Sequence, residues 1–547
     1  MDLQRNLFFM AFLLISFKIW QIWHVEYAHT QPQWKNNQNI QIAHHLEPAE
    51  KIITVKTDVL ELSISPKGGN VIQAKLLGFP ESLVIKNPLK LLDTTSTFLY
   101  QAQNKLLVGV KHRNSFSKNL VIDQNNALYK TTSNNFFLKP GQQTIQIPLS
   151  WENQGIIYNK IFVLHRKQYS IDINYLVTNN SNSSIEVSLI GQLKQSIQLP
   201  QSTKNNGNLN IQTYRGVAYS TDKEKYVKYK FNKISNNTNL DIRTSKGWIA
   251  MLQQYFITAW IPHTRGVNKF YTEKEKDNIV SVGYQSTPIT IHPNHKELLS
   301  ATLWVGPGLQ DQMSLVAPYL DLTVDYGLLW FISQPLFKLL KFIHKIIGNW
   351  GFSIILITFL VRVIMYPVTK AQYTSMVKMR LLQPRIQAIR DRMGDDKYRL
   401  SQEIMALYQS EKVNPLGGCL PLMIQMPIFL ALYYMLINSV ELRQAPFILW
   451  IHDLSAHDPY YILPVVMGIT MYFLQKMSPN TMIDPSQQKI FTYMPIIFSI
   501  FFFWFPSGLV LYYIVSNLLA ILQQILISYS INQKQYRRPN NKENAYK

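Results

Sequence analysis

The sequence has very little cysteine and comparatively few acidic residues. Its 547 residues include one cysteine, Cys419, so no internal disulfide can form and a thiol mechanism is disfavoured. Because Cys419 stands where an apolar segment begins, we expect it to be a packing residue. Lys and Arg number 54 against 32 Asp and Glu, which gives a formal net charge of +22. No basic run is interleaved with aromatic residues as a base-stacking groove requires, so nucleic-acid recognition by sequence is not expected, whereas anionic lipid or a ribosome fits this charge.

Motifs for energy coupling and hydrolysis are also missing. The chain contains no G-x-x-x-x-G-K-[ST], no H-E-x-x-H and no G-x-S-x-G. An ATPase, a zinc protease of the zincin type and an ordinary serine hydrolase are therefore disfavoured. We expect no enzyme activity, no cofactor and no metal site.

The chain divides into two parts of different composition. Residues 1–25 contain an apolar stretch without a following A-x-A-like cleavage site, which predicts an uncleaved transmembrane anchor, although Lys18 is unusual inside such a span. Residues 26–325 are polar, and short alternating stretches such as 59–64 and 184–189 are bounded by turn-forming residues. This pattern predicts a large β-sandwich.

Residues 326–350 have the pattern of an amphipathic helix at the membrane interface. Trp330 and Trp350 bracket it. One face carries apolar residues and another carries lysines: Leu336, Leu339, Leu340, Ile343 and Ile347 against Lys338, Lys341 and Lys345. The alternative is a core helix of the preceding domain.

Five further apolar segments are candidates for membrane spans. They are residues 351–368, 419–437, 461–474, 490–505 and 508–528. The third and fourth are shorter than the roughly 20 residues that a normal bilayer requires, which predicts local thinning of the membrane. The fold class expected is a polytopic α-helical membrane protein, with a five-span core, an N-terminal anchor and a large β-sandwich outside.

Basic residues set the expected orientation, because cytoplasmic loops are enriched in Lys and Arg. The loop 369–418 and the tail 529–547 are both basic, so we place them in the cytoplasm together with the loop 475–489 and the N-terminus. The β-sandwich and the loop 438–460 then lie on the outer side.

Arg362 is the most informative residue, because it lies within an apolar span. Thr358 and Tyr366 lie four residues on either side of it, which suggests one polar stripe along a helix. Other spans offer matching polar residues: Gln425, Tyr513, Asn517 and Gln524. Since no Asp or Glu lies in a span, a hydrated cavity open to the cytoplasm explains Arg362 better than a buried ion pair does. The alternative is an arginine that reaches the headgroups and only sets topology.

The loop 369–418 is predicted to be a helical hairpin, broken at residues 394–396. Its apolar residues have helical spacing: Met376, Met379, Leu382, Ile386 and Ile389, then Ile404, Leu407 and Tyr408. An apolar stripe with a basic surface suits docking of a nascent chain or a ribosome. The alternative is a solvated connector without a partner.

Several short motifs resemble those of the YidC family of membrane protein insertases. They are DLQRN (2–6), WFISQPLF (330–337), MYPVTKAQ (365–372), NPLGGC (414–419), QMPIF (425–429) and FPSGL (505–509). Their order and spacing match the Gram-negative form, most specifically over residues 325–528. The outer domain matches only in position, size and β character, and Lys18 in the first span is the one departure.

The resemblance implies a chaperone and insertase of the bacterial inner membrane, acting alone or with the Sec translocon. In that family the spans enclose a hydrophilic groove with a central arginine, a position that Arg362 occupies here. The resemblance further implies substrate contacts at Thr358, Gln425 and Tyr513, and substrate capture by the hairpin. Its partners would be nascent membrane proteins, the Sec translocon, anionic membrane lipids and, from the charge, a ribosome.

Two rival functions come from other classes. A transporter would use Arg362 to bind a small anion, but the paired repeats or broken helices of such a protein are not found in this sequence. An envelope scaffold would rely on the sandwich and use the spans only as anchors. Polar residues inside the spans are not needed for anchoring.

Overall fold

The computed structural model describes residues 51–95, 98–112, 115–116, 127–197, 215–235, 238–393, 396–411, 420–477 and 485–536. Some of the sequence predictions lie outside these residues. They are the anchor at 1–25, the start of the outer domain at 26–50, Cys419, the central part of the loop 475–489 and the end of the tail 529–547.

The N-terminal region is built from two β-sheets. One sheet has 12 strands, in the order β15 (Asp241–Thr244), β18 (Asn268–Lys274), β19 (Ile279–Gln285), β12 (Ile185–Ser196), β5 (Leu99–His112), β4 (Pro88–Thr94), β3 (Asn70–Pro80), β2 (Leu60–Ser65), β1 (Ile53–Lys56) and β8 (Asn135–Phe137), with β20 (Ile289–Ile291) beside β12 and β6 (Ser115–Phe116) beside β5. The other has 9 strands, in the order β14 (Val227–Lys230), β13 (Gly216–Ser220), β16 (Trp248–Gln253), β17 (Phe256–Pro262), β21 (His295–Pro307), β11 (Ser170–Asn179), β10 (Ile156–His165), β9 (Thr144–Asn153) and β7 (Lys130–Thr131).

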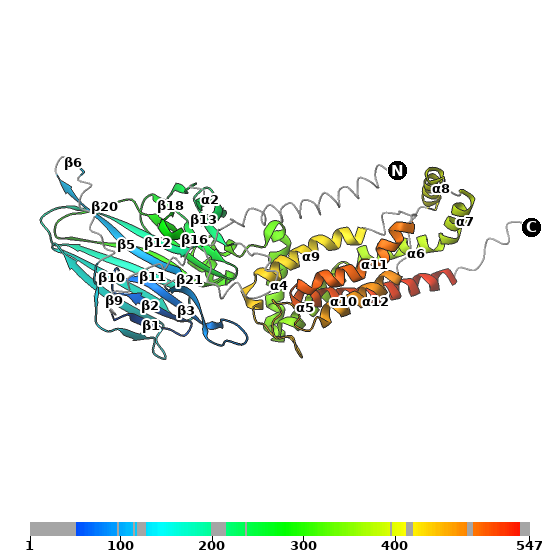
Figure 1. Cartoon of the computed structure of the whole chain (residues 1–547), viewed down its shortest axis with the longest axis horizontal. Coiled ribbons are helices and arrows are strands. Elements are labelled where there is room, and N and C mark those ends of the chain that lie inside the picture. Colours follow the sequence, from blue (N-terminus) through cyan, green and yellow to red (C-terminus); the bar gives the residue numbers. More distant parts are fainter. Residues whose placement is uncertain are drawn as a thin grey trace, which may run out of the picture.

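The two sheets face each other across one apolar core. Alternation along the strands produces it: in β2, Leu60, Leu62 and Ile64 are buried while the residues between them are partly exposed. Trp260 of β17 and Tyr284 of β19 meet across the sheets, with ring centroids 6.3 Å apart. The predicted β-rich character of the N-terminal region is thus confirmed, and its two layers lie at one end of the molecule (Figure 1).

One lysine lies in the middle of this core. Lys160 of β10 takes an inward position in the alternation, and its side chain is fully buried. Its ammonium group donates to the carbonyl oxygens of Gly69 at 2.6 Å and Asn104 at 2.8 Å, and it lies over the rings of Phe162 and Tyr175. Burial holds the pKa of Lys160 well below its usual value. Backbone oxygens and aromatic rings surround this amine, and no ion pair with a carboxylate is found for it among the residues that the structure describes.

The C-terminal region is helical, as the sequence predicts. After α2 (Phe231–Ser235), η3 (Lys276–Asn278) and α3 (Gln310–Val316) in the outer domain, its elements are η4 (Leu320–Thr323), η5 (Gly327–Leu329), α4 (Trp330–Ile347), α5 (Trp350–Ile364), α6 (Tyr366–Leu381), α7 (Gln383–Met393), α8 (Lys397–Ser410), α9 (Leu420–Asn438), η7 (Val440–Leu442), α10 (Ile462–Met477), α11 (Pro485–Phe501), η8 (Phe502–Trp504) and α12 (Ser507–Tyr536). The long helices α9 to α12 lead away from the sandwich, and α7 and α8 lie at the far end (Figure 1).

The predicted span 351–368 is shorter in the structure. α5 ends at Ile364, and α6 leaves at an angle of 65° to it. Pro367 stands in the first turn of α6, where it has no N–H to continue the α5 hydrogen bonds and its ring excludes the preceding helical turn. Residues 366–368 therefore belong to α6. The helix α12, by contrast, is longer than its predicted span, because residues 529–536 of the predicted tail continue it.

The described helices differ in how well they suit a bilayer. One segment, Ser507–Ser530, is long and apolar enough to cross a membrane by itself, and the bent pair of α5 and α6 would make a second. Three others are apolar but shorter: Gln425–Asn438, Ile462–Met477 and Thr492–Trp504. The count of five core spans consequently stays a prediction.

The helix α4 packs on its neighbours with the face that contains Phe337, Leu340 and Ile343, which are buried. Its last turn is closed by Gly348, whose φ of 75° is a left-handed conformation that a glycine adopts without strain. Phe342 and Ile346 remain exposed on another face. The helix thus packs on protein with one face and exposes apolar side chains on another, and its place in a membrane interface stays a prediction.

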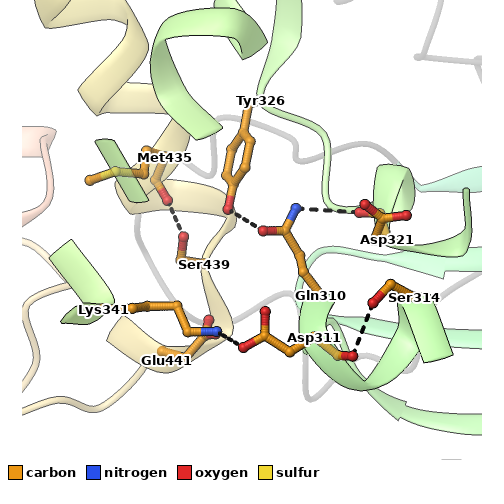
Figure 2. A network of polar contacts seen from close by, with 9 residues as sticks. All are labelled: Gln310, Asp311, Ser314, Asp321, Tyr326, Lys341, Met435, Ser439 and Glu441. Atoms are coloured by element: carbon orange, nitrogen blue, oxygen red, sulfur yellow. Dashed lines mark hydrogen bonds and ion pairs between the residues drawn. The ribbon is translucent and has the colours of Figure 1, made fainter. Parts of the chain in front are cut away.

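A polar network joins the sandwich to the helices (Figure 2). Lys341 Nζ of α4 lies 2.5 Å from Asp311 Oδ2 of α3 and 3.8 Å from Glu441 Oε1 of η7. Burial raises the pKa of the Glu441 carboxyl, and the charge of Lys341 opposes that shift. Beside this group, Tyr326 donates to the side-chain oxygen of Gln310 at 3.2 Å. These contacts hold α3 against α4 and the end of α9.

Candidate functional site

Arg362 lies in the last turn of an otherwise apolar helix. Asn349 caps the N-terminus of α5, because its side chain accepts a hydrogen bond from the backbone N–H of Phe352 at 3.2 Å. Between this cap and the bend at Met365 the helix consists mostly of large apolar residues. A cation in the last turn also interacts favourably with the carbonyl end of the helix dipole.

The guanidinium of Arg362 is held by a hydroxyl group of α12. Its Nε and Nη2 donate to Ser516 Oγ at 3.1 and 2.5 Å. The backbone oxygen of Arg362 accepts from Gln523 Nε2 at 3.3 Å, so the two helices are joined twice. Within the described part of the chain, no carboxylate forms an ion pair with Arg362, which is half-buried. A partly desolvated cation with one neutral partner is electrostatically unsatisfied and attracts water or polar groups.

Gln425 extends this polar arrangement to α9. Its Nε2 donates to Tyr512 Oη at 2.7 Å. Tyr512 and Ser516 are four residues apart on α12 and thus share one face, and both are buried. Through them α9, α12 and α5 form one connected polar region between Gln425 and Arg362.

Thr358 and Tyr366 do not continue this region as one stripe. Thr358 is buried, and its hydroxyl donates to the backbone oxygen of Ile354 at 2.5 Å, so it is satisfied within its own helix. Tyr366 lies beyond the bend, on α6, and is 41% exposed. The predicted stripe through Thr358, Arg362 and Tyr366 is therefore wrong beyond Ile364, because the helix ends there.

The ring contacts of Tyr513 and the hydrogen bond of Asn517 are made with residues other than Arg362. The ring of Tyr513 packs edge-on against Phe429 and Phe502, with centroid distances of 5.2 Å to each. Asn517 Nδ2 donates to Thr470 Oγ1 of α10 at 3.1 Å. Asn517 thus joins α12 to α10, and the structure does not bring it to the arginine.

The partners of Arg362 are residues that the sequence interpretation missed. Tyr512, Ser516 and Gln523 form a second polar stripe on α12, shifted by one residue from the predicted stripe of Tyr513, Asn517 and Gln524. Both stripes have helical spacing, so the pattern alone gives no reason to prefer one. Only the face on which α12 meets α5 separates them.

The apolar residues of the hairpin pack against one another. Met376, Met379, Leu382 and Tyr408 are buried in a separate cluster, and Ile386 is partly buried at its edge. The other buried members of this cluster are Tyr373 of α6, Leu400 and Ile404 of α8, and Ile527 of α12. The predicted apolar stripe is real, but it is not exposed for a nascent chain in this structure, because α6, α7 and α8 cover it. The hairpin can offer these side chains only when it opens.

We predict that Met379→Asp opens this hairpin. Met379 is 3% exposed, and a carboxylate at its place would be buried without a partner, which costs several kcal/mol. Limited proteolysis of the purified protein should therefore cut the hairpin much faster in this variant. Leu381→Asp is the matched control, since Leu381 is 54% exposed and two residues away. Equal proteolysis rates for the two variants would show that the cluster does not hold the hairpin closed.

Two family models match this chain. The one described as the YidC periplasmic domain matches residues 52–339, and the one described as the 60Kd inner membrane protein matches residues 342–535. The boundary between them falls within α4, after the last strand of the sandwich, β21.

Solved structures are also similar to the chain. An active YidC insertase crystal structure with the first transmembrane domain resolved is 18% identical, covers 88% of this chain and 93% of its own, and has a TM-score of 0.39. A galactose mutarotase related enzyme from Lactobacillus acidophilus is 10% identical over 46% of this chain and 97% of its own, with a TM-score of 0.30. The Slr1438 protein from Synechocystis sp. PCC 6803 is 11% identical over 50% of this chain and 99% of its own, also with a TM-score of 0.30.

The TM-scores are low, so family membership rests on the two family models. Together they account for most of the chain, and they divide it into a periplasmic domain and an inner membrane region. The β-rich and helical regions of the structure follow the same division. The chain is thus an inner membrane protein with a periplasmic domain, and it belongs to the YidC family.

Proposed function

We propose that this chain is a membrane protein insertase that inserts and folds integral membrane proteins in the inner membrane, alone or with the Sec translocon. Membership of the YidC family supports this function, and the single structural observation that carries it is Arg362. Arg362 is a cation at the end of an apolar helix, and its side chain bonds to one serine hydroxyl. It therefore creates a polar site beside surfaces that we expect to face lipid. Such a site can accept the polar segment of a substrate.

In the proposed arrangement, α5, α9, α10, α11 and α12 are the five spans of the core. The anchor at 1–25 precedes them, both termini and the hairpin are cytoplasmic, and the sandwich is periplasmic. The polar region from Gln425 to Arg362 lines a groove open to the cytoplasm and to lipid. Nascent membrane proteins are the substrates, and the basic hairpin meets anionic lipid and, during synthesis, the ribosome.

The proposed mechanism involves no covalent step and no nucleotide. The groove lowers the free energy of carrying a hydrophilic segment part-way across the bilayer, because polar groups and water replace hydrocarbon around it. The driving force comes from the substrate, which transfers about 20 apolar residues into lipid at roughly 0.8 kcal/mol per buried CH₂. Short spans such as α10 shorten the remaining path by thinning the membrane locally.

Water accessibility tests the groove directly. In a Cys419→Ser background, we expect Gln425→Cys and Tyr513→Cys to react with a membrane-impermeant thiol reagent and to crosslink to a stalled nascent membrane protein. Both side chains are partly exposed between helices, whereas Thr358 is buried, so Thr358→Cys should react more slowly.

Leu522→Cys is the matched control for this experiment. Leu522 lies on α12 and is 52% exposed as an apolar side chain, so in the proposed arrangement it faces lipid and should neither react nor crosslink. If Gln425→Cys and Leu522→Cys are equally unreactive in an active protein, no hydrated groove exists and the proposed mechanism fails.

A further inference from the structure

The turn between β3 and β4 displays three consecutive apolar residues. Leu83 is 50% exposed, Val84 is 90% exposed and Ile85 is 49% exposed. In a β-sandwich such residues would normally be polar, because a loop tip is surrounded by water. A contiguous apolar surface at a tip marks a contact with a partner or a membrane.

The turn is closed by its own hydrogen bonds. The backbone N–H of Ile85 donates to Ser82 Oγ at 2.9 Å, and the N–H of Ser82 donates to the backbone oxygen of Ile85 at 3.2 Å. The N–H of Glu81 donates to the oxygen of Asn87 at 2.9 Å. These bonds satisfy the N–H groups of Glu81, Ser82 and Ile85 within the turn. The remaining peptide groups of the tip can bond to water and phosphate in the headgroup region, so the apolar side chains can enter an interface but not the hydrocarbon centre of a bilayer.

The base of the turn is fixed to the helical region. Arg443 Nη2 donates to the backbone oxygens of Pro80 at 2.8 Å and Glu81 at 3.0 Å, and Gln444 Nε2 lies 3.4 Å from the Pro80 oxygen. Both side chains belong to the segment that follows α9 and η7. In Figure 1 the blue loop beyond β3 extends from the sandwich toward the helices.

The same segment lies at the corner between α4 and α5. Asn349 Nδ2, at that corner, donates to the backbone oxygen of Phe447 at 3.2 Å, and the ring of Phe447 covers Gly351 so closely that a Cβ there would lie 2.0 Å from it. Two residues later Leu449 is 75% exposed with a φ of 54°, a strained conformation for an apolar side chain. The segment whose side chains hold the base of the turn between β3 and β4 thus has an exposed apolar residue of its own.

We propose that the turn of residues 81–87 is a lipid contact of the periplasmic domain. Leu83, Val84 and Ile85 enter the headgroup and upper acyl region of the periplasmic leaflet, at the depth of about 5–10 Å that interfacial segments reach. Lys86 and Lys90, both exposed, face the anionic headgroups. The occupant is the lipid surface, because the turn is held next to the point where α5 begins.

Tethering explains how so small a surface can be effective. Three apolar side chains on a free domain would bind a bilayer weakly. Here the sandwich is already joined to membrane helices through Arg443 and the network around Lys341, so binding of the turn is intramolecular and its effective lipid concentration is high. The contact would set the tilt of the periplasmic domain above the membrane.

Fluorescence quenching in vesicles tests the proposal on the full chain. In a Cys419→Ser background, Val84→Cys is labelled with an environment-sensitive fluorophore and reconstituted in vesicles of phosphatidylethanolamine and phosphatidylglycerol. We expect a blue-shifted emission, quenching by lipids with a spin label near the headgroup, and several-fold weaker quenching by aqueous iodide than at the control site. The measurement needs no substrate, so its result is independent of insertion activity.

Leu298→Cys supplies the control site. Leu298 is 60% exposed on β21. It lies nine residues before Pro307, where β21 ends and the chain leads to α3. Nine residues of extended strand separate the two positions by about 30 Å. Equal iodide quenching at both sites would overturn the proposal. Two other results would also overturn it and indicate a protein contact instead. In the first, Val84→Cys is protected from iodide but is not quenched by spin-labelled lipid. In the second, the protection disappears when the protein is diluted in lipid.

Discussion

Arg362→Ala is expected to slow membrane insertion by about ten- to a hundredfold, which corresponds to loss of a charge-assisted interaction of about 1.5–3 kcal/mol. The guanidinium is the charge that makes the groove polar, and alanine leaves the Ser516 hydroxyl without its donor. Arg362→Lys should lose less, because lysine keeps the charge but not the planar donor pair that reaches Ser516. Ser516→Ala should have the smallest effect, since the charge remains.

Insertion of a single-span substrate into proteoliposomes measures these rates. Arg265→Ala is the matched control for loss of one positive charge, because Arg265 is exposed on the sandwich between β17 and β18, outside both the groove and the hairpin. Its removal should leave the rate unchanged. If Arg362→Ala inserts the substrate at the rate of the unaltered protein with normal topology of its own helices, Arg362 only orients α5 and the groove hypothesis is wrong.

Lys160→Glu is expected to unfold the periplasmic domain. The carboxylate would face the backbone oxygens of Gly68, Gly69 and Asn104 in a site with no solvent access. An uncompensated buried charge costs several kcal/mol, which is comparable with the whole stability of about 5–15 kcal/mol of a typical domain. Lys296→Glu is the control, because Lys296 is an exposed lysine on β21. Denaturant unfolding of the full chain, followed by tryptophan fluorescence, should separate the two variants clearly, and equal midpoints would contradict the buried position of Lys160.

The lowered pKa of Lys160 also predicts a pH dependence. The folded domain loses this proton at a lower pH than the unfolded chain, for which the usual value is 10.5. Between these two values the unfolded state binds more protons, so stability rises with pH, by at most about 1.4 kcal/mol per pH unit for one proton. Buried tyrosines such as Tyr100, whose pKa is raised by burial, act in the opposite direction near and above pH 10. The window to measure is therefore neutral to mildly alkaline pH.

Lys160→Met isolates this contribution. Methionine keeps the approximate length of the side chain but cannot bind the proton, so the rise in stability from neutral to mildly alkaline pH should be smaller in this variant than in the unaltered protein. The denaturant midpoint of the periplasmic domain at several pH values measures the difference. Identical pH profiles would mean that Lys160 titrates normally and is reached by water.

The division of the chain was readable from local pattern. Alternating residues in stretches such as 59–64 form β2 with one buried face, and the apolar segments form α5 and α9 to α12. The same alternation places Lys160 on the inner face of β10, but a pattern contains no sign of the carbonyl oxygens that receive its ammonium group, because Gly69 and Asn104 come from β2–β3 and β5, far away in the sequence.

The candidate site was only partly predictable for a related reason. Arg362 and Gln425 stand out because polar residues in apolar segments are rare. Their partner Ser516 does not stand out, since α12 carries two adjacent polar stripes with the same spacing. The hairpin shows the converse: Met376 and Met379 were correctly placed on one face, but that face is buried against Leu400 and Ile527 and is not open to a nascent chain.

By itself the sequence determined which segments are strands and helices, that the chain divides into two parts of different composition, and that a lone arginine lies in an apolar helix. These properties depend on neighbours within one or two turns, and side-chain period and hydrophobicity express them directly. Only the tertiary structure decided that α5 ends before Tyr366, that Arg362 meets Ser516 and not Asn517, and that an apolar turn of the sandwich stands beside the α4–α5 corner. Those outcomes depend on which faces of distant elements meet, and packing of the whole chain selects among faces that the sequence leaves equivalent.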